Sequence, residues 1–224
     1  MRSAISPNRR HEVFSRYGAK TADAKLTSGR DAILQSLARA RGMRPPLAER
    51  NIPPWAGDVV TSFIAKAKAS AAYVHDIASP VDAPQRICQI LRTSSNTLEI
   101  HLPAVSPLNA LPWQSAPELR LSPQPPGGDS SAFSLAEFGI AEIGTVVFFS
   151  GQQSPSAWHF LPGREFVLLY KNCILPRLED VISRLADMPA TINLITGPSR
   201  TADIEQTIEM GAHGPREVHI LIAG

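Results

Sequence analysis

Apolar segments of two kinds alternate along most of this 224-residue chain, and this alternation constrains the fold more than any other feature. Apolar residues three or four positions apart are typical of amphipathic helices, whereas short aliphatic and aromatic runs are typical of buried strands. Helices that separate strands at this spacing favour a mainly parallel sheet flanked by helices. We therefore expect an α/β fold. With 43% hydrophobic residues the chain can bury a sizeable core, and its length favours a single domain.

The apolar period indicates both kinds of element. The expected helices are an N-terminal one from the cap Ser28 to Arg39 with Gly42 after it, then about 57–69, one that begins at Pro84, 176–188 and 201–210. The expected strands are 72–75, 97–101, 145–149, 166–170, 191–195 and 218–222. The runs 145–149 and 166–170 are apolar throughout, which predicts that both strands are buried on two faces.

Prolines interrupt the segment at about 102–128, where they remove backbone donors too often for a regular element. We expect an extended loop, and loops of this length are typically lids, binding surfaces or links. Trp113 lies within this segment. A large aromatic residue there suits packing of the loop and binding of a partner equally well.

Charge and hydrophobicity argue against several classes of protein. The formal net charge is +2 and 19% of residues are charged, so we expect no binding of nucleic acid or of an anionic membrane. Residues 1–27, expected to form a flexible tail, carry basic residues but no apolar core of an export signal, so we expect a cytoplasmic protein. The longest apolar runs are far shorter than the roughly 20 residues of a membrane span.

Cys88 and Cys173 are the two cysteines, and they lie far apart in the sequence. Neither has a second cysteine or a histidine at metal-ligand spacing, so we expect no metal site and no four-cysteine iron–sulfur cluster in this chain. Free cysteines usually behave as small buried hydrophobes.

The sequence GPSRTAD at 197–203 lies between an expected strand and an expected helix. Ligands of parallel α/β sheets collect beyond the carboxyl ends of strands, where helix N-termini attract anions. The candidate ligand-binding residues are Gly197, Ser199, Arg200, Thr201 and Asp203. From the residues alone, a capping role for Ser199 or Thr201 is favoured over a ligand site, because a cap needs only one residue.

Two further residues are candidates for catalysis. His213 lies in the turn GAHGP at 211–215, and could act as acid or base near neutral pH, although a lone histidine is more often structural. Glu142 precedes the expected strand at 145–149. A desolvated carboxylate there could act as nucleophile or base, and a solvated one would do neither.

The sequence GPSRTADIE at 197–205, followed by GAHGP at 211–215, closely resembles the LUD-domain family of the lactate-utilisation protein C type. Weaker support comes from IAEIGT at 140–145, Leu161-Pro162, ILPRL at 174–178 and the opening helix after Ser28. The resemblance therefore covers about 28–223 and is strong in the last third and patchy before it. The chain departs from the family at Ile143, where threonine is usual, and at 163–166, which lacks the histidine that usually follows the Leu-Pro pair.

The resemblance implies a single LUD domain at 28–224 with a fold like the NagB, RpiA and CoA-transferase group. It implies a non-redox subunit or accessory protein of a system that oxidises L-lactate to pyruvate, with iron–sulfur clusters in LutA-like and LutB-like partner proteins and no cofactor in this chain. It also favours ligand binding by Arg200, Asp203 and His213. The alternative is a stand-alone enzyme of the isomerase and CoA-transferase-like group that acts on an anionic small molecule.

Overall fold

The computed structural model describes residues 29–39, 52–95, 97–202, 208–210 and 214–224. The chain forms two units, residues 1–54 and 55–224. In the first unit a helix spans 29–39, as expected, and its Ile33, Leu34 and Leu37 side chains are exposed. The expected cap Ser28, the expected stop Gly42 and the expected tail at 1–27 lie outside the described residues.

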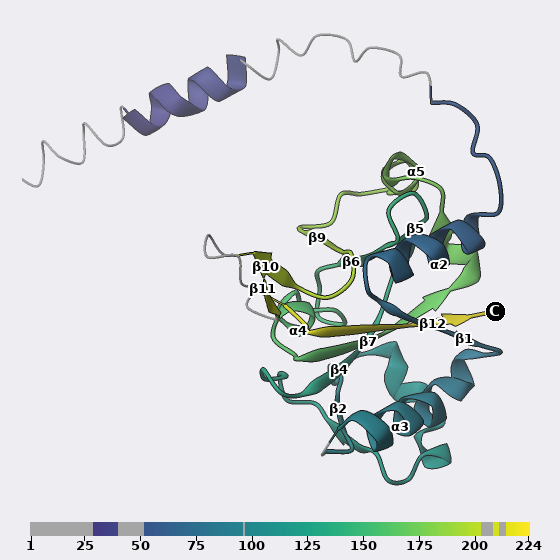
Figure 1. Ribbon diagram of the computed structural model, residues 1–224. Coiled ribbons are helices and arrows are strands. Elements are labelled where there is room, and N and C mark those ends of the chain that lie inside the picture. The colour runs from purple at the N-terminus through teal and green to yellow at the C-terminus, as the bar shows by residue number, and fades with distance from the viewer. Residues whose placement is uncertain (1–28, 40–51, 96, 203–207, 211–213) are drawn as a thin grey trace, which may run out of the picture. The chain divides into compact units, whose positions relative to one another are not determined.

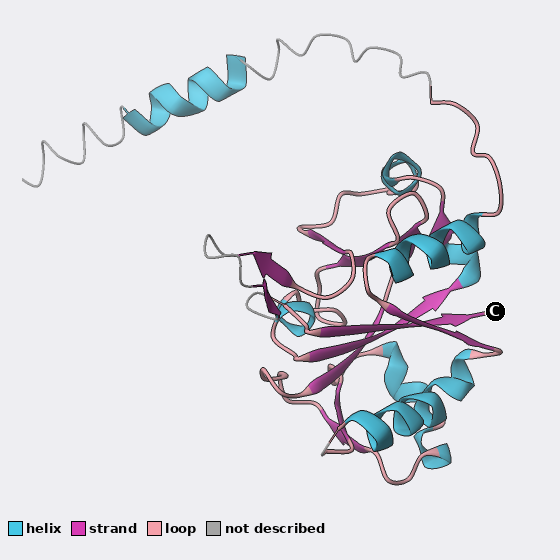
Figure 2. Cartoon of the chain, viewed as in Figure 1, coloured by secondary structure: helices cyan, strands magenta, loops and turns pink. Residues whose placement is uncertain are grey.

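A six-stranded parallel sheet is the centre of the second unit (Figures 1 and 2). Its strands, in spatial order, are β1 (Tyr73–Ile77), β12 (Glu217–Ala223), β7 (Arg164–Tyr170), β4 (Ser131–Leu135), β2 (Glu99–His101) and β3 (Arg120–Ser122). Each neighbouring pair is parallel. The expected α/β class with a mainly parallel sheet is confirmed.

The central strand β7 supplies side chains to both faces of this sheet. Phe166 and Leu168 belong to one buried cluster, and Val167 and Leu169 to the other. This alternation follows from the two-residue period of a strand, and it explains why the expected strand at 166–170 is apolar throughout.

Helices cover the two faces of the sheet, α3 (Ala83–Ser94) on one side and α2 (Val59–Ala69) on the other (Figure 1). From α3, Ile87 and Leu91 enter the cluster that contains Phe166. Helix α2 begins at Asp58, whose side chain accepts a hydrogen bond of 2.7 Å from the Thr61 amide. A capped start and a buried apolar stripe together account for this helix.

A second, four-stranded sheet lies on the α2 side. It consists of β8 (Ile174–Leu175), β5 (Phe138–Ile140), β6 (Thr145–Phe149) and β9 (Ile192–Ile195), and β9 runs antiparallel to β6. Val146 and Phe148 of β6 pack in the α2 cluster, whereas Val147 packs with Val181 of α5 (Leu178–Ser183). Strand β6 is therefore buried on two faces, as expected, but it belongs to a different sheet from β7.

The segment at 102–128 is more ordered than a simple loop. It contains 3₁₀ turns at Pro107–Ala110 and Trp113–Ser115, and it also contains β3, which pairs with β2. The indole Nε1 of Trp113 donates a hydrogen bond of 2.9 Å to the Leu108 carbonyl, and its ring meets the edge of Phe133. Packing of the loop is thus the role that the structure assigns to Trp113.

Two of the expected helices need correction. The helix expected at 201–210 is wrong, because β10 (Arg200–Ala202) and β11 (Ile208–Met210) pair as antiparallel strands. Thr201 and Ile208 are β-branched, a side-chain type that favours strands over helices. Helix α5 ends at Ser183, short of the expected 188, and Pro189 disfavours helical geometry in the residue before it.

Three short helical segments complete the described part of the second unit: α4 (Ala157–Phe160) and 3₁₀ turns at Pro80–Asp82 and Lys171–Cys173. None of the helices in the described part of the chain has the length and apolarity needed to cross a bilayer.

Candidate functional site

The two signature segments line one cavity of about 300 Å³. Residues 194–200 and the pair Gly214–Pro215 form two of its walls, and His159 and Phe160 of α4 form the third. The structure therefore brings together Gly197, Ser199 and Arg200, which the sequence marked as ligand-binding residues.

Close backbone contacts hold these segments in place. The Ser199 amide donates a hydrogen bond of 2.8 Å to the Pro215 carbonyl, and a Cβ on Gly214 would lie 3.2 Å from the Cβ of Ser199. Gly197 has a φ of 70°, and a Cβ there would overlap the carbonyl oxygen of Ser70 at the end of α2. Gly197 is thus required by the backbone as well as lying in the cavity wall.

The cavity is not at the carboxyl ends of the parallel strands, and this part of the sequence-based argument is wrong. The segment 197–200 follows β9 of the second sheet, and the other walls immediately precede β7 and β12. The cavity therefore lies near the amino ends of two parallel strands. The N-terminus of the helix expected at 201–210 was predicted to attract an anion, but the structure has the start of β10 at this position.

The cavity combines one cation with apolar surface. The Arg200 side chain is exposed, and no ion-pair partner for it is present among the described residues. Ser199 adds a half-buried hydroxyl, and the exposed side chains of Phe160 and Leu194 add apolar surface. A guanidinium beside a hydroxyl and apolar groups is suited to a small carboxylate or phosphate ligand.

A buried polar network lies behind the wall that α4 provides. The His159 ring stacks on Phe148 with centroids 4.0 Å apart, and its Nδ1 lies 2.6 Å from Oε1 of Glu165. Its Nε2 lies 2.9 Å from the Ser154 hydroxyl. His159 and Glu165 are both fully buried. The sequence did not indicate this network, because its three residues fall on a turn, a helix and a strand.

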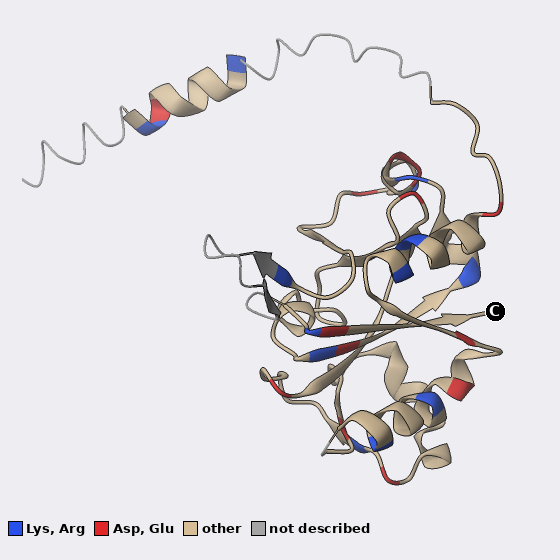
Figure 3. Ribbon diagram, viewed as in Figure 1, with Lys and Arg blue, Asp and Glu red and all other residues tan. Residues whose placement is uncertain are grey.

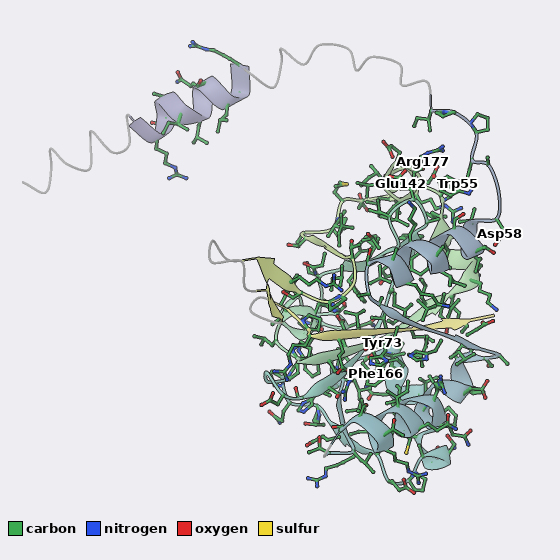
Figure 4. All side chains as sticks on the ribbon, in the orientation of Figure 1. Trp55, Asp58, Tyr73, Glu142, Phe166 and Arg177 are labelled. Atoms are coloured by element: carbon green, nitrogen blue, oxygen red, sulfur yellow. The ribbon has the colours of Figure 1, made fainter. Side chains whose placement is uncertain are left out.

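Glu142 does not line this cavity. It lies in the turn before β6, its side chain is partly exposed, and its carboxylate is 3.9 Å from Nε of Arg177. The Arg177 guanidinium in turn lies over the ring of Trp55 (Figure 4). His213 and Asp203 lie outside the described residues, and only the backbone of Thr201, in β10, is described.

Charged side chains gather at the amino ends of β7 and β12, where Figure 3 shows a basic residue followed by an acidic one on each strand. Nε of Arg164 donates to Glu217 at 2.5 Å and Arg216 donates to Asp129 at 2.7 Å, beside a second cavity of about 370 Å³. The hydrogen bond from Arg164 lowers the pKa of Glu217. Because both guanidinium groups are paired with carboxylates, this cavity is less suited to an anion than the one at Arg200.

Two histidines, His219 and His75, extend the hydrogen-bonded group that contains Glu217. His219 Nε2 lies 3.2 Å from Glu217, and its Nδ1 lies 3.1 Å from Nε2 of His75. The rings of Tyr73 and Phe166 stack on His219 (Figure 4 labels both residues). Burial lowers the pKa of both histidines, that of His75 to about 4. In the described residues no group of histidine, cysteine and carboxylate side chains is arranged to hold a metal ion.

Comparison with known families identifies the part of the chain that carries the cavity. Residues 130–223, which include both signature segments, match the LUD domain family. The match covers the strands β4 to β12, which include three strands of the parallel sheet and all of the second sheet.

Part of the chain is also similar to curated proteins. "Lactate utilization protein C" of Geobacillus thermodenitrificans is 35% identical over 96 residues, which are 40% of this chain and 40% of that protein. The protein of that name from Bacillus pumilus is 36% identical over 42% of this chain and 43% of its own length. YkgG of Escherichia coli, named as uncharacterized, is 39% identical over 39% and 41%. The similarity thus spans about 40% of the length of these relatives.

A solved structure shares the fold over a longer stretch. The crystal structure of a DUF162 family protein from Deinococcus radiodurans matches with a TM-score of 0.55 and 16% identity, over 77% of this chain and 100% of that one. At this identity the match concerns the fold alone. The match in fold is longer than the stretch of residues 130–223 that matches the family.

Proposed function

We propose that this protein takes part in lactate utilisation as a non-redox subunit or accessory protein, and that the cavity at Arg200 binds a small carboxylate such as L-lactate or pyruvate. The observation that carries the proposal is that both signature segments line one cavity, in a chain that is similar over about 40% of its length to proteins named Lactate utilization protein C.

The chemistry of the cavity supports a small carboxylate ligand. Arg200 offers a planar fork of donors to a carboxylate, and the Ser199 hydroxyl can donate to a second oxygen or to a hydroxyl on the ligand. A volume of about 300 Å³ is at the lower end for small-molecule sites, which suits a ligand of a few heavy atoms.

The cysteine count supports partners that carry the electrons. Oxidation of lactate to pyruvate releases two electrons, and a four-cysteine cluster to accept them would need more than the two cysteines of this chain. Neither Cys88 nor Cys173 is bonded to the other, and Cys88 is buried. We therefore assign the iron–sulfur clusters to partner proteins.

Ligand binding can be tested with the purified full-length protein by titration calorimetry with L-lactate and with pyruvate. We expect binding of at least one of them, and a loss of at least about tenfold in affinity for Arg200→Ala, because one charge-assisted pair is worth about 1.5–3 kcal/mol. Arg120→Ala is the matched control, since Arg120 is an exposed arginine on the edge strand β3. Equal affinities in all three proteins would remove Arg200 from the site.

The role in lactate utilisation can be tested genetically in the organism that carries this chain. Deletion of the gene should abolish or slow growth on L-lactate as carbon source, and the wild-type chain should restore it. The tagged protein should co-purify with proteins that bind iron–sulfur clusters, recognised by their visible absorbance and iron content. Normal growth of the deletion strain together with purification of the chain alone would refute the proposal.

A further inference from the structure

Ser154, His159 and Glu165 form a continuous hydrogen-bonded series that the role in lactate utilisation does not use. The Ser154 hydroxyl lies 2.9 Å from Nε2 of His159, and Nδ1 of His159 lies 2.6 Å from Oε1 of Glu165. A nucleophile, a base on its hydroxyl and a carboxylate that orients the base occur in this order in enzymes that transfer acyl groups. From this geometry we propose that Ser154 is a nucleophile, activated by His159, for esters or thioesters of a small carboxylic acid.

Hydrogen-bond chemistry assigns the direction of this series. An ionised carboxylate only accepts hydrogen bonds, so Nδ1–H of His159 donates its hydrogen bond to Glu165. The other ring nitrogen, Nε2, then carries a lone pair that accepts the proton of the Ser154 hydroxyl. His159 is thereby held in the tautomer that a general base requires.

The surroundings make these contacts strong and the geometry rigid. His159 and Glu165 are fully buried, and the His159 ring stacks on Phe148. The second oxygen of Glu165, Oε2, is buried and has no hydrogen-bond partner among the described residues. A buried carboxylate with an unused oxygen is costly for stability, which motivates a role in stabilising a protonated imidazole.

Ser154 is the most exposed of the three residues in this hydrogen-bonded series. Ser154 is half-buried, and its backbone exchanges hydrogen bonds of 3.2 Å with Gly151 across a tight loop. His159 lines the wall of the cavity that contains Arg200, whereas Ser154 is not among the residues that line this cavity.

The reaction is balanced without an oxidant or reductant. The Ser154 oxygen forms a bond to the acyl carbon while its proton passes to Nε2 of His159 and Glu165 stabilises the imidazolium. The bond from the acyl carbon to the alcohol oxygen or thiol sulfur then breaks, and the leaving group takes the proton from His159. Attack by water, or by another acceptor, on the acyl-serine restores the hydroxyl.

A fluorophosphonate probe tests this proposal on the full-length protein, because such probes attach to activated serines with loss of fluoride. We expect the probe on the peptide that contains Ser154, and none on Ser154→Ala. Ser156→Ala is the matched control, since Ser156 lies in the same segment but accepts a hydrogen bond from Asn193. It should be labelled at the wild-type rate. Absence of the probe from Ser154 in the wild-type protein would overturn the proposal.

Glu165→Gln separates a positioning role from a merely structural one. We expect labelling of Ser154 to slow by at least about tenfold, and the pH profile of labelling to shift, because the carboxylate no longer stabilises the protonated ring. An unchanged rate and pH profile in a folded Glu165→Gln protein would contradict the proposal. His159→Gln should abolish labelling.

A second variant covers failure of the histidine substitution to fold. In Ser154→Cys the introduced thiol faces the same imidazole, so it should be alkylated by iodoacetamide faster than Cys173, as peptide mapping can measure. A slower reaction than that of Cys173 would refute activation by His159. These outcomes do not depend on binding of lactate or pyruvate, so this proposal and the proposed function can fail separately.

Discussion

The imidazole rings of His75 and His219 share a hydrogen bond of 3.1 Å between the neighbouring strands β1 and β12. Arg86 lies 3.0 Å from Nδ1 of His75, and a guanidinium can only donate, so this nitrogen accepts. His75 therefore donates from Nε2 to His219, which donates in turn to Glu217. The arrangement is satisfied only while both rings are neutral, because a protonated ring would place two donors against each other.

Stability should therefore decrease in mildly acidic solution. Burial, and then the electrostatic effects of His219 and Arg86, lower the pKa of His75 from 6.5 to about 4. The unfolded chain binds this proton first, so the stabilising contribution is complete above pH 6.5 and is lost as the pH falls from 6.5 to about 4. We expect a loss of about 1–2 kcal/mol for this half-exposed group, measured by urea unfolding at about pH 7.5 and about pH 4.5.

His75→Gln isolates this contribution from those of other titrating groups. The glutamine side chain cannot titrate, so the variant should lose less stability than the wild-type protein over the same pH range. The variant is expected to be less stable at neutral pH, because Arg86 and His219 each lose a partner. An identical pH dependence in both proteins would show that His75 does not carry the effect.

Trp113→Phe should lower stability through one hydrogen bond. The substitution keeps an aromatic ring against Phe133 and removes the Nε1 donor, whose partner is the Leu108 carbonyl at 2.9 Å. The expected loss in the free energy of unfolding is about 1 kcal/mol, compared with about 3 kcal/mol for Trp113→Ala, which also removes the ring. Unaltered unfolding of both variants would argue that the indole does not hold the proline-rich segment.

The two thiols should differ in their rates of alkylation. Burial and the hydrogen bond to Glu118 raise the pKa of Cys88, and burial raises that of half-exposed Cys173. Less thiolate and less access both slow the reaction of Cys88. Peptide mapping after iodoacetamide treatment should find Cys173 modified first and Cys88 only after denaturation. Faster modification of Cys88 in the native protein would mean that its segment opens locally.

The sequence predicted the parallel sheet best where apolar runs were long. Strand β7 was found because five consecutive apolar residues serve both faces of the sheet. Strand β4 lies beside it and was missed, since Ser131, Ala132 and Ser134 are small residues that give no apolar run although they are buried. Its position became recognisable only through pairing with β7.

The candidate site was predicted in part, for a related reason. The segments at 197–200 and 214–215 were marked by sequence, and the structure places both on one cavity. No pattern in the sequence indicated that β9 belongs to a second sheet, so the predicted location of the site relative to the parallel strands was wrong. Ser154, His159 and Glu165 lie within twelve residues, but only the packing of a turn, α4 and β7 brings their polar atoms together.

Gly197→Ala should destabilise the protein at the junction between the cavity and the rest of the fold. The residue has a φ of 70°, and a Cβ there would overlap the Ser70 carbonyl at the end of α2. Left-handed geometry in a non-glycine residue and overpacking each cost about 1–3 kcal/mol, so we expect a loss of about 3 kcal/mol. Gly127→Ala is the matched control, because nothing lies within 4 Å of a Cβ there, and it should change stability by at most about 0.5 kcal/mol.

Since any relief of the overlap moves the segment that carries Ser199 and Arg200, the Gly197 variant should also lose affinity for a carboxylate, even at temperatures where it remains folded. Equal unfolding free energies for the two variants would show that the chain next to Ser70 can shift without cost, and the cavity wall would then not be fixed by this contact.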